Sequence, residues 1–393
     1  MGKRIPIIFL LIDGLADLLS KEKTPLMKAN TPNLDYLASK GMVGEINLLP
    51  KTIPPNKIYS SLSFLGYDPK RYKIKRGAAE AIGMNIPLKD GDLAWSYTFA
   101  TLDEKGNILD RKAGLDGYKL DEVVRSINEF VDVSVPYVFL RSYDTRGALV
   151  FRGNFSDKVS DNFVYGSKKP RMVKPLVEDK AASLASVITN NFIENAVSVM
   201  EYHQVNLERM NKGLLPVNYL IVRGASSKIP NLPDFKEKWK IEKAIVLAEP
   251  GVERGVALIA GFDSINFEPI NFSSDLNRIF NQLEDLIVNY DFIFVHLHHL
   301  EKVCWKQDCD SKIKMIEKID EKLEFFRNFE GIFVLGSQRV ISCKNREDVH
   351  SKVPVLVFGK KKDKVKKFDE KSVKKGKIKG ISGTKLWSIV FGK

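Results

Sequence analysis

Short apolar runs bounded by turn residues recur along this chain, and helical patterns lie between them. Six runs have the length and composition of buried strands: residues 5–12, 217–224, 243–250, 292–299, 331–337 and 353–359. Helical patterns cover, for example, residues 31–41 and 310–329. This alternation is typical of α/β folds with a doubly wound, largely parallel sheet. In such a fold the chemistry is expected at the carboxyl ends of the strands.

The middle of the chain has a different pattern. Residues 134–153 form two β-rich runs around a turn, with a helical pattern at 119–130 before them and an irregular polar segment at 154–180 after them. With 393 residues the chain is long enough for two domains. We therefore predict a core domain of residues 1–102 plus 181–393, and an inserted smaller α+β domain of residues 103–180.

Composition and charge limit the classes of partner. No apolar run reaches the ~18 residues of a membrane span, and acidic Asp13 and Asp17 follow the apolar start, where a signal peptide would have small residues. Three cysteines do not suggest a disulfide framework, so a cytoplasmic protein is expected. Much of the +13 net charge comes from residues 360–379, with eleven lysines, three carboxylates and no arginine. This pattern favours a solvated surface over nucleic-acid binding.

Asp13 is the first candidate for a functional residue. It follows the first predicted strand directly, and Gly14 allows a tight turn beside it. A carboxylate at this place can hold a cation. It can equally cap the next helix, and the motif alone does not separate the two roles.

A series of motifs in unbroken order connects the chain to a known family. These are IDGLAD (12–17), TPLMKANTPNLDYLASKGMVG (24–44), SLSFLGYDPKRYKIKRGAAEAIGMNIPLKDGD (61–92), FATLDEKGNILDRKAG (99–114) and DFIFVH (291–296). Together they resemble the archaeal type of cofactor-independent phosphoglycerate mutase, of the alkaline phosphatase superfamily. The resemblance implies an alkaline-phosphatase-like core, two manganese or zinc ions, and a serine that passes a phosphoryl group between two hydroxyls of glycerate.

The nucleophile position of the resemblance holds Lys57 instead of serine. An ammonium neither accepts a phosphoryl group nor ligates a cation while it is charged. It can, however, offset a buried carboxylate, so we predict a salt bridge between Lys57 and Asp13. Ser60 and Ser61, close by in sequence, are the alternative nucleophiles if phosphoryl transfer is retained.

The resemblance also implies six metal ligands besides the serine, and only Asp13 matches unaltered. Glutamate and aspartate can replace a ligand, but an indole cannot. Besides Asp13, the five metal-ligand positions are occupied by Glu301, Trp305, Ser337, Gln338 and Asp348. A lysine that the family places near the end of the strand run 292–299, which is not a ligand, is His298 here. We expect no bound pair of metal ions, with Asp13, Glu301 and Asp348 as the remaining weak metal candidates.

The substrate side retains several basic residues. Arg76, Arg111, Arg146 and Arg223 fall in matching motifs, and Asp161 remains in the segment that the family uses for the phosphate. These residues are candidates for binding a phosphate or carboxylate. The alternative is that the arginines form structural ion pairs.

A new zinc site is a further alternative. His296 and His298 alternate along a predicted strand, and Cys304, Cys309 and Cys343 lie in loops near the same sheet edge. Their spacing matches no standard zinc pattern. The leading prediction is therefore a catalytically degenerate mutase relative that binds a phosphorylated small molecule or a protein. The alternative is an active phosphoglycerate mutase, or a related phosphoryl-transfer enzyme, with rearranged ligands.

Overall fold

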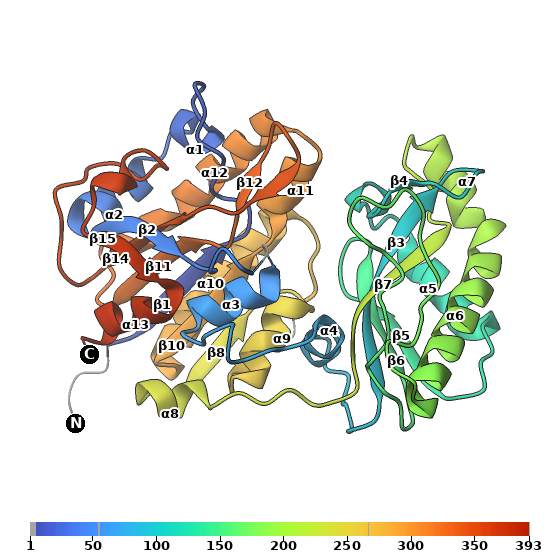
Figure 1. Cartoon of the computed structure of the whole chain (residues 1–393). Helices are drawn as coiled ribbons and strands as arrows, with labels where there is room; N and C mark the ends of the chain where they lie inside the picture. Colours follow the sequence, from blue (N-terminus) through green and yellow to red (C-terminus); the bar gives the residue numbers. More distant parts are fainter. Residues whose placement is uncertain (1–4, 54–55, 266, 393) are drawn as a thin grey trace. The chain divides into compact units, whose positions relative to one another are not determined.

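The computed structural model describes residues 5–53, 56–265 and 267–392, and these form two compact units (Figure 1). Unit 1 comprises Met1–Lys73, Leu232–Ala248 and Val256–Lys393. Unit 2 comprises Ile74–Asn231 and Glu249–Gly255. The inserted unit thus differs from the predicted 103–180 at both ends, because the strands on either side of that range pair with each other inside unit 2.

Unit 1 is built on an eight-stranded sheet in the order β15-β2-β14-β11-β1-β10-β8-β9. The strands are β1 (Ile7–Ile12), β2 (Met42–Asn47), β8 (Ala244–Leu247), β9 (Asp263–Ser264), β10 (Phe292–Leu297), β11 (Ile332–Ser337), β14 (Val353–Phe358) and β15 (Ile378–Ser382). The expected α/β class is confirmed. The run 353–359, expected to be parallel, is instead antiparallel to both of its neighbours. Strand direction depends on the connection, which an apolar run does not encode.

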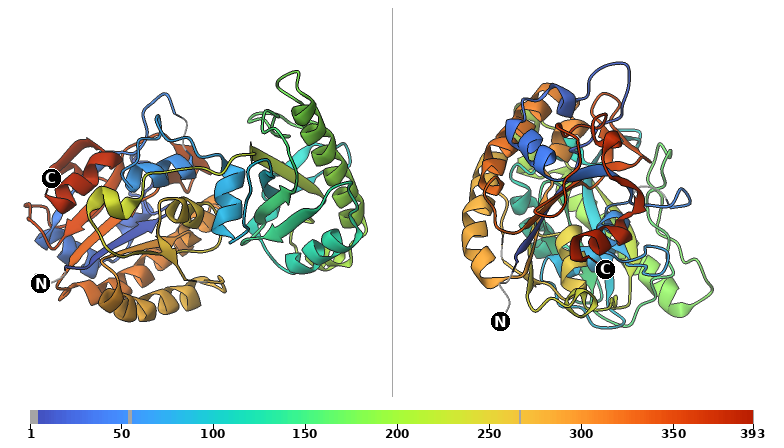
Figure 2. Two further views of the ribbon diagram at one scale, coloured as in Figure 1. Left: turned by 90° about the horizontal axis from the view of Figure 1, so that it is seen from below. Right: turned by 90° about the vertical axis from the view of Figure 1, so that its left-hand side faces the viewer.

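Helices cover both faces of this sheet, so its central strands β1, β10 and β11 are buried throughout (Figure 2). Ile8, Leu10 and Ile12 of β1 belong to one apolar core with α2 (Pro32–Lys40), α10 (Phe272–Asn289) and α12 (Cys309–Leu323). Phe9 points to the other face, where its ring contacts those of Phe64 and Trp387. These two residues belong to α3 (Lys57–Phe64) and α13 (Gly383–Phe391).

Parallel register brings the carboxyl ends of three central strands to one edge of the sheet. Ile12 of β1 lies opposite Leu297 of β10 and Ser337 of β11. The next residue, Asp13, donates its backbone N–H to the Leu297 carbonyl. The segments that follow β1, β10 and β11 are therefore neighbours, as expected for chemistry at such an edge.

Unit 2 has an antiparallel sheet made of β4 (Ile108–Asp110), β3 (Leu93–Leu102), β6 (Arg146–Phe151) and β5 (Tyr137–Arg141), with β7 (Tyr219–Ser226) also paired to β3. The run 217–224 was predicted to be a parallel core strand and is this β7 instead. A largely buried strand of an antiparallel sheet and a parallel strand carry the same apolar signature.

The remaining elements are short connections or cover the sheets. In unit 2, residues of α5 (Leu120–Phe130), α6 (Lys180–Glu201) and α7 (Gln204–Asn211) share an apolar core with the sheet. The others are α1 (Pro25–Lys28), α4 (Arg76–Gly83), α8 (Phe235–Trp239), α9 (Val252–Ile259), α11 (His299–Trp305), β12 (Val340–Ser342) and β13 (Glu347–Val349). Among the described residues, no helix has both the length and the apolar character needed to cross a membrane.

Candidate ion-pair site in unit 1

Five charged residues meet at the carboxyl edge of the unit 1 sheet: Asp13, Lys57, Glu301, Arg339 and Asp348. We call them the ion-pair cluster. Asp13 follows β1, Glu301 lies in α11 after β10, and Arg339 follows β11. Lys57 begins α3, whose N-cap Asn56 accepts the backbone N–H of Ile58 through its side chain. The fold thus gathers residues that lie far apart in sequence.

Lys57 lies between two carboxylates. Its Nζ is 2.9 Å from Oδ2 of Asp13 and 2.7 Å from Oε2 of Glu301. The Lys57 and Glu301 side chains are nearly buried, and Asp13 is completely buried. The salt bridge predicted between Lys57 and Asp13 is therefore confirmed, and Glu301 shares the same ammonium.

Arg339 was not among the residues predicted from sequence, yet it contacts all three carboxylates. Its guanidinium donates to both oxygens of Asp13, at 3.1 and 2.7 Å, and to both oxygens of Asp348, at 2.9 and 2.7 Å. The same group lies 3.3 Å from Glu301. Burial would lower the pKa of Arg339, but the charges of Asp13, Asp348 and Glu301 raise it well above its ordinary value. Arg339 is therefore a permanent cation here.

The uncharged residues at the positions where the resemblance implies metal ligands are held by hydrogen bonds. Ser337 Oγ donates to the Arg339 carbonyl and accepts the backbone N–H of Ala16. Gln338 contacts His296 through Oε1 and donates to Ser61 Oγ through Nε2. Trp305 donates its indole N–H to Glu301. These side chains support the cluster, and neither the indole nor the guanidinium offers a lone pair to a cation.

A divalent ion does not fit this set of donors. Asp13, Glu301 and Asp348 supply carboxylate oxygens, but each of these oxygen pairs already faces Lys57, Arg339 or both at hydrogen-bond distance. Metals need several deprotonated donors that converge on one point, and here that point is occupied by protein cations. The two cations thus take over the charge compensation that metal ions would provide.

The predicted zinc site is not formed by the residues proposed for it. Cys309 and Cys343 form a disulfide, and Cys304 is a buried free cysteine. His298 was expected to continue the alternation of β10, but the strand ends at Leu297 and the His298 ring stacks on His299 in the turn into α11. The spacing argument failed because it assumed an extended backbone beyond the end of the strand.

The state of the cysteines predicts a thiol count. Burial raises the pKa of Cys304 to about 11, so this thiol should not react with a thiol reagent in the native protein at neutral pH. Protein unfolded without a reductant should expose one reactive thiol, and protein unfolded after reduction should expose three. Titration with a chromogenic disulfide measures both values. Three thiols without reduction would contradict the Cys309–Cys343 bond.

In unit 2, three of the four arginines predicted to bind an anion interact electrostatically: Arg76, Arg146 and Arg223. Burial and the positive charges of Arg76 and Arg146 lower the pKa of Arg223 to about 10. The Nε of Arg223 has no hydrogen-bond partner among the described residues. Asp161 lies near Arg223 and accepts the backbone N–H of Gly224. Several guanidiniums held close together favour the binding of an anion.

The alternative of structural ion pairs fits some of these arginines better than others. Arg76 donates to Ser96 Oγ at 3.1 Å and lies 3.7 Å from Glu80, so it is partly compensated. Arg146 donates to the hydroxyl of Tyr143. Arg111, also predicted for binding, stacks instead on the rings of Phe163 and Tyr165, at 5.3 and 4.8 Å from their centroids. Arg223 is thus the strongest candidate anion ligand.

Comparisons with known proteins agree with this fold. A family model described as 2,3-bisphosphoglycerate-independent phosphoglycerate mutase matches residues 38–206. A protein of that name from Methanosphaera stadtmanae is 33% identical over 98% of this chain and 96% of its own, and one from Archaeoglobus fulgidus is 32% identical over 98% and 97%. A solved structure of a cofactor-independent phosphoglycerate mutase from Thermoplasma acidophilum has a TM-score of 0.61 at 28% identity, with 99% of both chains covered. A Pyrococcus horikoshii structure has a TM-score of 0.75 at 25% identity, covering 99% of this chain and 97% of its own.

Proposed function

Because the chain belongs to the family of 2,3-bisphosphoglycerate-independent phosphoglycerate mutases, we propose that it binds a phosphorylated small molecule but does not transfer phosphoryl groups through metal ions. The observation that carries this proposal is the ion-pair cluster. Lys57 stands where the resemblance places the nucleophilic serine, and its Nζ contacts two of the carboxylates that remain for a metal. An ammonium held in this way has no lone pair for phosphorus.

The binding half of the proposal rests on Arg223. A buried guanidinium Nε that lacks a partner among the described residues is costly unless a ligand supplies the acceptor. A phosphate or carboxylate oxygen would satisfy the Nε and would offset the repulsion from Arg76 and Arg146. Phosphoglycerate carries both groups and is the first ligand to test.

A second candidate function is an active mutase with rearranged ligands, and the names of the relatives favour it over the inactive protein. It needs a different nucleophile. Ser61 Oγ accepts a hydrogen bond from Gln338, and Ser60 borders a cavity of about 20 Å³ with Gln338 and Arg339. Such a cavity holds about one water molecule, so Ser60 could meet a substrate only if residues that line the cavity moved apart.

An activity assay separates the two candidates. With manganese present, purified protein should show no interconversion of 3-phosphoglycerate and 2-phosphoglycerate, while the Methanosphaera stadtmanae relative serves as the positive control. Metal analysis should find no stoichiometric manganese or zinc. Turnover that disappears in the Asp13→Ala variant would establish the active enzyme instead.

Ligand binding is measured separately by calorimetry. We expect 3-phosphoglycerate to bind the protein, and Arg223→Gln to weaken binding about tenfold or more, because a charge-assisted hydrogen bond is lost. Arg111→Gln is the matched control, since its guanidinium is engaged with two aromatic rings. Equal effects of the two substitutions would contradict the assigned role of Arg223.

A further inference from the structure

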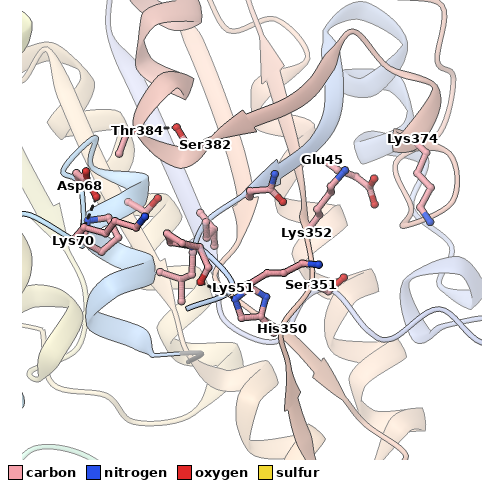
Figure 3. Close-up of a pocket in the computed structure, with 16 residues that line it drawn as sticks. Glu45, Lys51, Asp68, Lys70, His350, Ser351, Lys352, Lys374, Ser382 and Thr384 are labelled. Carbon is pink, nitrogen blue, oxygen red and sulfur yellow. Dashed lines mark hydrogen bonds between the residues drawn. The ribbon is translucent and has the colours of Figure 1, made fainter. Parts of the chain in front are cut away.

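An open cavity of about 760 Å³ lies in unit 1, on the side of the sheet formed by its edge strands (Figure 3). Its walls come from the end of β2, the loop after it, the turn at residues 68–70, the segment after β13, and the junction between β15 and α13. All of these belong to unit 1. The volume is within the range of sites that bind small molecules.

Four lysines surround this cavity: Lys51, Lys70, Lys352 and Lys374. Figure 3 shows Lys70 at one end, Lys51 beside His350 in the middle, and Lys352 and Lys374 toward the other end. Among the described residues, none of the four ammonium groups has a carboxylate within ion-pair distance. Two carboxylates, Glu45 and Asp68, also line the cavity, so positive charge is in excess.

Two further features of the wall point to an anion. Helix α13 starts at this cavity with its N-cap Ser382 and with Thr384, and no side chain of the described residues caps its first backbone N–H groups. A helix start with uncapped N–H groups favours negative charge. The hydroxyl of Ser63, 1% exposed and also in the wall, has no hydrogen-bond partner among the described residues. Leu48, Leu49, Pro50 and Pro69 add an apolar side.

We propose that this cavity binds a small metabolite that carries two or more phosphate groups. One phosphate would lie near the start of α13, and another would reach the lysines at the far end of the cavity. The carbon skeleton would rest against the apolar side. This site is separate from the ion-pair cluster and from Arg223, so it is independent of whether the protein transfers phosphoryl groups.

Calorimetry with inorganic pyrophosphate at low ionic strength tests the proposal. We expect saturable binding with one site per chain. Lys70→Gln and Lys352→Gln should each weaken binding about tenfold, because each removes a charge-assisted contact. Lys371→Gln is the matched control: it changes the net charge equally, is exposed, and lies outside the cavity wall.

Several results would overturn this assignment. One is the absence of binding, and another is an equal effect of all three lysine substitutions, which would indicate nonspecific charge attraction. A loss of pyrophosphate binding in Arg223→Gln but not in Lys70→Gln would place the probe in the arginine site of unit 2. Binding of a single-stranded oligonucleotide that pyrophosphate cannot displace would indicate a nucleic-acid surface.

Discussion

Replacing Lys57 by methionine should lower the free energy of unfolding by about 3–5 kcal/mol. Methionine is an unbranched side chain only one atom shorter than lysine, so the expected loss comes mainly from charge. Without the ammonium, Asp13 and Glu301 lose a cationic partner and keep their contacts with Arg339, although both are nearly or completely buried. Chemical denaturation of the two proteins, monitored by circular dichroism, measures the difference.

A matched control is the exposed ion pair between Lys344 and Glu22, whose atoms are 3.2 Å apart. Lys344→Met should leave the free energy of unfolding almost unchanged, because both partners are well solvated. Adding Glu301→Gln to Lys57→Met should recover part of the loss, since one uncompensated carboxylate is removed. If Lys57→Met were as stable as Lys344→Met, Lys57 would have no role in balancing the cluster.

Four of the five residues of this cluster were named from the sequence, and Arg339 was missed. Lys57 was found because it stands in a motif whose usual residue is known, and a cation beside Asp13 follows from elementary electrostatics. Arg339 stands in no such motif position. A signal was nevertheless present: an arginine lies two residues after the end of a predicted strand that neighbours the strand of Asp13, at the same sheet edge. An arginine at this place can pair with Asp13 across the sheet edge, as Arg339 does.

Strand direction was predictable where an apolar strand run is connected to the next strand through a helix. The runs that became β1, β8, β10 and β11 are parallel as expected, because helices follow or precede them and cover both faces. The runs that became β7 and β14 carry the same apolar signal, yet their partners are set by contacts far along the chain. The disulfide was not predicted either, since its two cysteines are 34 residues apart and their proximity depends on the loops after β10 and β11.

Removing both cations should turn the cluster into a metal site. In the double variant Lys57→Ser, Arg339→Ser, the carboxylates of Asp13, Glu301 and Asp348 lose the protein cations that they contact. Carboxylate oxygens are suitable ligands for manganese. Manganese should therefore stabilise this variant, by about 2.7 kcal/mol at a concentration 100-fold above Kd. The wild-type protein should show no such shift in Tm, because its own cations already occupy the space between the carboxylates.

A control must show that stabilisation of the double variant by manganese is not a general effect of ionic strength. Sodium chloride at matched ionic strength should give a smaller shift in the double variant, because screening lacks the directed bonds of a bound ion. Adding Asp13→Asn should remove most of the manganese effect, since Asp13 is completely buried and is one of the two carboxylates that contacted both cations. If the double variant folds poorly alone, the yield of folded protein with and without manganese gives the same information. Equal stabilisation of wild type and double variant would mean that manganese binds elsewhere, and that Lys57 and Arg339 do not act in place of metal ions.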